Sequence, residues 1–111
     1  VAICSNDTEA YPADSFDNMK KMAMAHDFTF PYLHDKSQDV AKGYEAVCTP
    51  DFFGYNADLK LQYRGRLDAS RKEAGSKDLP RDLFDAMEQV AKTGKGPKDQ
   101  IASMGCSIKW K

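Results

Sequence analysis

The feature that most constrains the fold is the change of hydrophobic period along the chain. Residues 1–4 form an apolar run without alternation, which is typical of a buried parallel strand. Residues 59–64 instead alternate apolar with polar side chains after a turn at 56–58, which predicts an antiparallel hairpin with one buried face. Segments with helical spacing follow each of these strands. The order therefore predicts an α/β fold that closes with antiparallel strands.

Two longer helices have recognisable ends. Asp14 or Ser15 can cap the first helix. The last helix has Pro80 in its first turn and Gly94 as its stop. The side chains expected on the apolar faces are Phe16, Met19, Met22, Ala23 and His26 in the first helix and Leu83, Phe84, Met87, Val90 and Ala91 in the last.

Shorter elements are expected between these helices. The sequence predicts an extended segment over 28–33, a brief helix capped by Ser37, and a polar loop over 65–78. We expect one domain over residues 1–94, followed by a carboxy-terminal tail over residues 95–111.

Composition excludes several classes of protein. The chain has 111 residues and a formal net charge of −1, which lacks the cationic surplus that an electrostatic nucleic-acid binder needs. No apolar run approaches the roughly 20 residues that cross a bilayer. The opening residues do not resemble a secretory signal, so we expect a cytoplasmic location and no membrane or nucleic-acid partner.

The spacing of the cysteines and the lack of nucleotide-binding motifs predict that the protein holds no metal ion and no cofactor. Cys4, Cys48 and Cys106 are widely spaced and lack the paired ligands of a zinc site. Neither a P-loop nor a dinucleotide-binding glycine pattern is present.

The most informative short segment is residues 47–52, Val-Cys-Thr-Pro-Asp-Phe. A cis bond before Pro50 would turn the backbone and leave the Thr49 carbonyl and amide unpaired by the sheet. Those groups could then bind an extended substrate or lie beside a thiol. The alternative is an ordinary trans proline at the start of a strand.

Motifs through nearly the whole chain resemble the peroxiredoxin-like branch of the alkyl hydroperoxide reductase / thiol-specific antioxidant family. The matching segments are Ser5-Asn6-Asp7, Tyr11-Pro12-Ala13-Asp14-Ser15, Phe30-Pro31-Tyr32-Leu33, Cys48-Thr49-Pro50-Asp51-Phe52-Phe53, Tyr63-Arg64-Gly65-Arg66-Leu67-Asp68 and Gly105-Cys106-Ser107-Ile108-Lys109-Trp110. The resemblance implies a thioredoxin-like fold with a mixed sheet, in which Pro50 is the cis proline of the active-site face. It also implies that Thr49 and Pro50 contact substrate.

The resemblance further implies an amino-terminal strand, a first helix and an attacking cysteine upstream of Val1. Without that central strand, the strands expected at residues 1–4 and 51–55 lack a partner between them. We therefore expect this chain to be the carboxy-terminal part of a longer protein. A missing amino-terminal segment or a second copy in a homo-oligomer would supply the strand.

The cysteines of this chain have two interpretations each. Cys48 is either a resolving thiol near the catalytic face or a small buried apolar residue. Cys106 is either a resolving thiol carried by the tail or a free surface thiol, and whether it pairs with Cys48 stays open. Cys4 is expected in the core, without a redox role. Arg64 and Arg66 are interpreted as solvated arginines at a strand end.

The function implied is that of a thiol-dependent oxidoreductase, an antioxidant that reduces peroxides or disulfides in cell redox homeostasis. Its partners would be a thiol reductant or a disulfide-bearing protein, with a peroxide as a further substrate. The full-length protein would be the enzyme, and this fragment alone would be inactive. The alternative is a thioredoxin-fold binding or scaffold domain without turnover.

Overall fold

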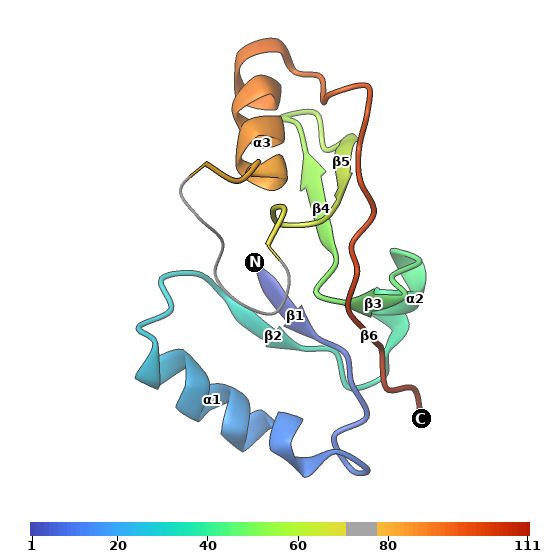
Figure 1. Ribbon diagram of the computed structural model, residues 1–111. Coiled ribbons are helices and arrows are strands. Elements are labelled where there is room, and N and C mark those ends of the chain that lie inside the picture. Colours follow the sequence, from blue (N-terminus) through green and yellow to red (C-terminus); the bar gives the residue numbers. More distant parts are fainter. Residues whose placement is uncertain (71–77) are drawn as a thin grey trace. The chain divides into compact units, whose positions relative to one another are not determined.

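The computed structural model describes residues 1–70 and 78–111 (Figure 1). The chain forms two units. Unit 1 consists of residues 1–47 and 107–111, and unit 2 consists of residues 48–106. The segment expected as a tail is thus divided between the units, and backbone hydrogen bonds hold it in both. In unit 1 the Asp7 amide donates to the Lys109 carbonyl at 2.7 Å, and in unit 2 the Arg66 amide donates to the Ile101 carbonyl at 3.0 Å.

Unit 1 contains a parallel strand pair at the residues where the sequence predicts one, but the predicted burial is wrong, since Val1 is 81% and Ile3 43% exposed. β1 (Ala2–Cys4) pairs with β2 (Tyr32–His34), and Cys4 lies opposite His34. The extended segment begins later than expected, because Pro31 contributes only its carbonyl, which accepts from the Ala2 amide at 3.0 Å.

Helix α1 (Phe16–Ala25) follows a short 3-10 turn, η1 (Pro12–Asp14). Ser15 is confirmed as its cap, since Ser15 Oγ accepts from the Asn18 amide at 3.2 Å. The predicted apolar face is only partly buried. Met19 is 4% exposed, whereas Phe16 and Met22 are 47% and 50% exposed.

Helix α2 (Asp39–Gly43) is capped by the predicted Ser37 and by a second side chain that the sequence did not predict. Ser37 Oγ accepts a hydrogen bond from the Asp39 amide at 3.2 Å. The next two amides of the helix donate to a different side chain. The Asp35 carboxylate accepts from Val40 N at 3.3 Å and from Ala41 N at 2.9 Å. A buried carboxylate therefore caps this helix together with Ser37.

Unit 2 contains the predicted antiparallel hairpin. β4 (Phe52–Tyr55) pairs with β5 (Leu61–Gly65), with an irregularity between Gly54 and Tyr55. The prediction that Leu59 belongs to the second strand is wrong. Leu59 has a φ of 60° and is 82% exposed, because the Asn56 side chain accepts from the Asp58 and Lys60 amides and extends the turn.

Helix α3 (Asp82–Thr93) packs on β4 and β5 in unit 2. Its side chains Ala86 and Val90 are buried there with Tyr63 of β5. Phe84, expected on the apolar face, is 52% exposed. Gly94 ends the helix as predicted, with a φ of 76°. Of the predicted loop, residues 71–77 lie outside the described residues.

The remaining strands, β3 (Cys48–Thr49) and β6 (Cys106–Ser107), pair with each other. Within the described residues, β1 pairs only with β2 and β4 only with β5. The described residues thus form an α/β fold with short parallel and antiparallel sheets and three α-helices. No helix in residues 1–70 or 78–111 is long and apolar enough to span a membrane.

Candidate functional site

The candidate site is the loop between β3 and β4 in unit 2. The Thr49–Pro50 peptide bond is cis, as the family resemblance predicts, and both residues are exposed. The backbone of Thr49 differs from the prediction, however. Thr49 belongs to β3, and β3 pairs with β6 rather than leaving the groups of Thr49 unpaired.

Cys48 lies half-buried directly before this loop. Its sulfur is 3.8 Å from the carbonyl oxygens of Pro50 and Ser103, and the thiol can donate to either. Burial raises the pKa of the Cys48 thiol, the charge of Asp51 raises it further, and the charge of Arg64 opposes both effects. Cys48 is therefore held as a thiol that ionises less readily than a free cysteine.

The two charges that shift the pKa of Cys48 in opposite directions form an ion pair. Arg64 Nη2 lies 3.4 Å from Asp51 Oδ2, and the Asp51 side chain is almost completely buried. The guanidinium of Arg64 also stacks over the Phe53 ring, 5.0 Å from its centroid. The interpretation of Arg64 as a solvated arginine at a strand end is thus wrong.

Cys106 lies on the strand that pairs with β3. Its side chain is exposed, and Thr49 Oγ1 donates to its carbonyl oxygen at 3.5 Å. The structure therefore brings all four predicted site residues together in unit 2: Cys48, Thr49, Pro50 and Cys106. All three cysteines of the chain are free thiols, so Cys48 and Cys106 are not joined by a disulfide.

Cys4 belongs to unit 1, where it is half-buried rather than a core residue. Burial raises the pKa of its thiol, a hydrogen bond from the Asn6 backbone lowers it, and the Asp14 charge raises it. Within the described residues, no group of three or more histidine, cysteine or acidic side chains is arranged to hold a metal ion.

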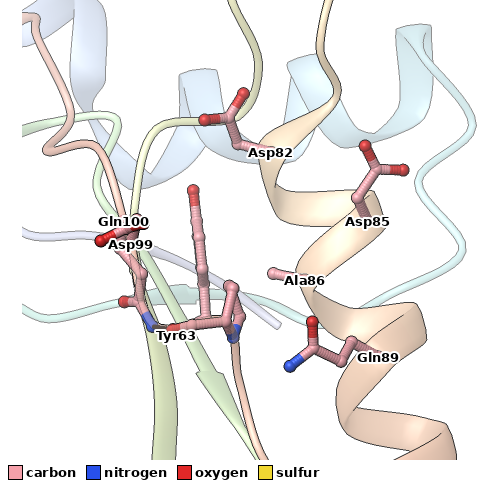
Figure 2. Close-up of a pocket in the computed structure, with 8 residues that line it drawn as sticks. Tyr63, Asp82, Asp85, Ala86, Gln89, Asp99 and Gln100 are labelled. Carbon is pink, nitrogen blue, oxygen red and sulfur yellow. Dashed lines mark hydrogen bonds between the residues drawn. The ribbon is translucent and has the colours of Figure 1, made fainter.

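A small cavity in unit 2, which the sequence did not predict, lies between α3 and β5 (Figure 2). Its volume is about 200 Å³. The lining residues are Tyr63, Asp82, Asp85, Ala86, Gln89, Pro97, Asp99 and Gln100. The sequence holds one indication of this cavity. It is a pair of acidic residues one turn apart at the start of an expected helix, Asp82 and Asp85.

Hydrogen bonds connect the wall of this cavity to the end of β5. Tyr63 Oη donates to the Arg66 carbonyl at 2.6 Å, and Arg66 Nε donates to Asp82 Oδ2 at 3.0 Å. Burial raises the pKa of Tyr63, the Asp82 charge adds to this, and the Arg66 charge opposes it. Arg66, expected as a solvated arginine, thus links β5 to α3.

Comparison with known proteins found structural neighbours without assigned activity. No family model and no curated protein matches the chain. A conserved uncharacterized protein from Geobacillus kaustophilus is 49% identical with a TM-score of 0.89, and a hypothetical protein from Sinorhizobium meliloti 1021 is 41% identical with a TM-score of 0.91. Each alignment covers 99% of this chain.

The chain spans about three fifths of the length of these solved proteins, 58% of the first and 60% of the second. It therefore shares the fold of the corresponding part of each protein.

Proposed function

We propose that this chain is part of a thiol-dependent oxidoreductase with a thioredoxin-like fold, related to the peroxiredoxin-like branch of the alkyl hydroperoxide reductase / thiol-specific antioxidant family. The observation that carries the proposal is the cis Thr49–Pro50 bond, with one cysteine directly before it on β3 and another on the paired strand β6. The parallel pair β1–β2 with α1 between its strands, and a hairpin followed by α3, support the same fold.

In the proposed reaction the attacking thiolate belongs to a segment upstream of Val1. The thiolate sulfur attacks the hydroxyl oxygen of a hydroperoxide, so an S–O bond forms, the O–O bond breaks, and the alkoxide leaves and takes a proton from solvent to become the alcohol. The sulfur becomes a sulfenic acid, and the peroxide is reduced. A second thiol, Cys48 or Cys106, condenses with that sulfenic acid and releases water. An external dithiol then reduces the resulting disulfide and is itself oxidised.

With a disulfide as substrate, the same thiolate attacks one sulfur and expels the other as a thiolate. A resolving thiol then releases the substrate from the mixed disulfide. The three free thiols fit a reducing compartment such as the cytoplasm.

The test uses the full-length protein with its upstream segment. The reduced protein is mixed with tert-butyl hydroperoxide or hydroxyethyl disulfide in the presence of a dithiol, and loss of the oxidant is followed. Intact mass after alkylation then counts the thiols that form disulfides. Turnover by the wild type supports the proposal. We expect Cys48→Ser or Cys106→Ser to stop turnover at the sulfenic acid or mixed disulfide, whereas Cys4→Ser serves as the control with wild-type turnover.

If the full-length protein consumes neither oxidant and forms no disulfide, the proposal is wrong. The alternative, a binding or scaffold domain built on the same loop, then stands.

A further inference from the structure

Residues 101–106 of unit 2, here called the strap, lie along the end of β5 and the cis-proline loop. The Ile101 carbonyl accepts from the Arg66 amide at 3.0 Å. Ser103 Oγ donates to the Gly65 carbonyl at 2.7 Å, and the Ser103 carbonyl lies 3.8 Å from the Cys48 sulfur. These contacts attach the strap to two separate strands of the same unit.

The strap makes its closest approach at Thr49. Gly105 packs directly on the Thr49 carbonyl, and a Cβ at position 105 would overlap that oxygen and lie 3.5 Å from the Pro50 nitrogen. Thr49 Oγ1 donates to the carbonyl of the next strap residue, Cys106, at 3.5 Å. Only glycine permits this spacing, because any side chain would push the strap away from the loop.

The edge of Thr49 is therefore already occupied. Thr49 belongs to β3, which pairs with β6, and Gly105 lies against its carbonyl; because the amide and carbonyl of an extended residue point to the same side, the pairing edge of Thr49 faces the strap. An extended polypeptide binds a strand by hydrogen bonding to a free edge of this kind. Such a polypeptide would have to displace the strap before it could pair with Thr49.

We propose that the strap restricts the substrates of this site to small molecules, hydroperoxides or low-molecular-weight disulfides, and excludes disulfides within polypeptides. This inference rests on the proposed function and names its substrate class. A small substrate can bind without forming hydrogen bonds to the backbone of Thr49. Thr49, Pro50 and Cys106 are exposed residues, so a small molecule can reach them although the strap packs on the Thr49 carbonyl.

The experiment compares kcat/KM of the full-length protein for tert-butyl hydroperoxide and hydroxyethyl disulfide with kcat/KM for insulin, whose disulfides lie within a polypeptide. We expect the better small substrate to exceed insulin by about tenfold or more, the factor that corresponds to losing roughly 1.4 kcal/mol of binding in the transition state.

Two variants loosen the strap in different ways. Gly105→Ala introduces the overlap with the Thr49 carbonyl, and Ser103→Ala removes the bond to Gly65 without adding volume. Because both substitutions weaken the strap contacts, we expect each to reduce the ratio of kcat/KM for small substrates to kcat/KM for insulin by at least about threefold. Gly43→Ala is the matched control, because nothing lies within 4 Å of a Cβ at that position. It should leave the ratio unchanged.

Hydrogen exchange supplies a readout that does not depend on turnover. The Thr49 amide should be protected in the wild type and in Gly43→Ala, and should exchange faster in Gly105→Ala and Ser103→Ala.

The inference is overturned if the wild type reduces insulin as efficiently as the small substrates, or if neither strap variant changes the ratio or the exchange. In both cases the proposed function survives, because turnover is still observed. Absence of turnover with every substrate contradicts the proposed function itself, and the inference falls with it.

Discussion

Cys48 shows how single charges set the chemistry of this loop. Burial and the carboxylate of Asp51 raise the pKa of its thiol, and the guanidinium of Arg64 lowers it. Since the thiolate is the nucleophile, burial, which has the largest effect, and these two charges together set how fast Cys48 reacts near neutral pH.

Substitutions of the ion pair should therefore change the reactivity of Cys48 in opposite directions. Asp51→Asn removes the charge that disfavours the thiolate, so alkylation of Cys48 by iodoacetamide at pH 7.5 should accelerate by about threefold, equivalent to a pKa decrease of roughly half a unit. Arg64→Gln should slow the same reaction. Peptide mapping of the alkylated protein measures both rates, with Asp58→Asn in the exposed hairpin turn as the control. Equal rates in all variants would contradict this account.

Asp35 carries a buried charge whose role is structural. Burial raises the pKa of its carboxyl, but hydrogen bonds from the Ala41 amide, the Ser5 hydroxyl and the Val40 and Gln38 amides together lower it below its usual value. The ionised carboxylate thus stabilises the fold around α2.

Asp35→Asn should reduce the free energy of unfolding by about 1.5–3 kcal/mol at pH 7, the range for hydrogen bonds to a charged group. A carboxyl whose pKa is lowered by folding stabilises the protein above its unfolded pKa of about 3.9, and this contribution is lost as the pH falls through the folded value. Urea unfolding should therefore show the difference between wild type and variant shrinking from pH 7 to pH 3. Asp27→Asn, at an exposed residue of the same unit, should show little effect at either pH; a difference for Asp35→Asn that does not depend on pH would refute the assignment.

At the scale of elements, two helix ends are predicted correctly, the start of α1 at Ser15 and the end of α3 at Gly94, whereas Pro80 precedes α3, which begins at Asp82, rather than lying in its first turn. Ser15 and Gly94 are local signals, since each acts on backbone groups within four residues of itself. The exposure of Phe16, Met22 and Phe84 depends on what packs over each helix, which local periodicity does not contain.

The role of Gly94 in ending α3 can be tested directly. Its φ of 76° places it in the left-handed region, so Gly94→Ala should lower the free energy of unfolding by about 1–2 kcal/mol. Gly43→Ala makes the same change at a helix end without a positive φ and with open space around it, so it should be neutral or slightly stabilising. Thermal unfolding of the two variants measures the difference, and equal midpoints would show that the backbone at Gly94 relaxes.

At the scale of the whole molecule, the carboxy-terminal residues belong to the packed structure. Ile108 is 5% exposed in unit 1, and its amide donates to the Val47 carbonyl at 3.4 Å. In the same unit the Gln38 side chain donates to the Lys109 carbonyl at 2.9 Å and accepts from the Lys111 amide at 3.1 Å.

Ile108→Ala should therefore cost about 2–5 kcal/mol of unfolding free energy, as expected for removing a buried aliphatic side chain. Ile101→Ala is the matched substitution at a half-exposed side chain and should cost less than about 1 kcal/mol. Urea unfolding of both variants measures the contrast. Comparable losses would mean that the end of the chain does not contribute to the core of unit 1.

Features that depend on near neighbours in the chain can be predicted from local sequence. The hairpin at β4 and β5, the Ser15 cap, the Gly94 stop and the cis Thr49–Pro50 bond follow from short motifs, the last with the help of a family resemblance.

Contacts between distant segments are visible only in the folded protein. Asp35 accepts from two amides of α2 in addition to the amide that Ser37 binds, and Arg64 pairs with Asp51 across the hairpin. The strap closes on Thr49 across more than fifty residues of sequence. Such contacts depend on which segments fold against each other, and a local pattern of residues carries no information about partners that far away in the chain.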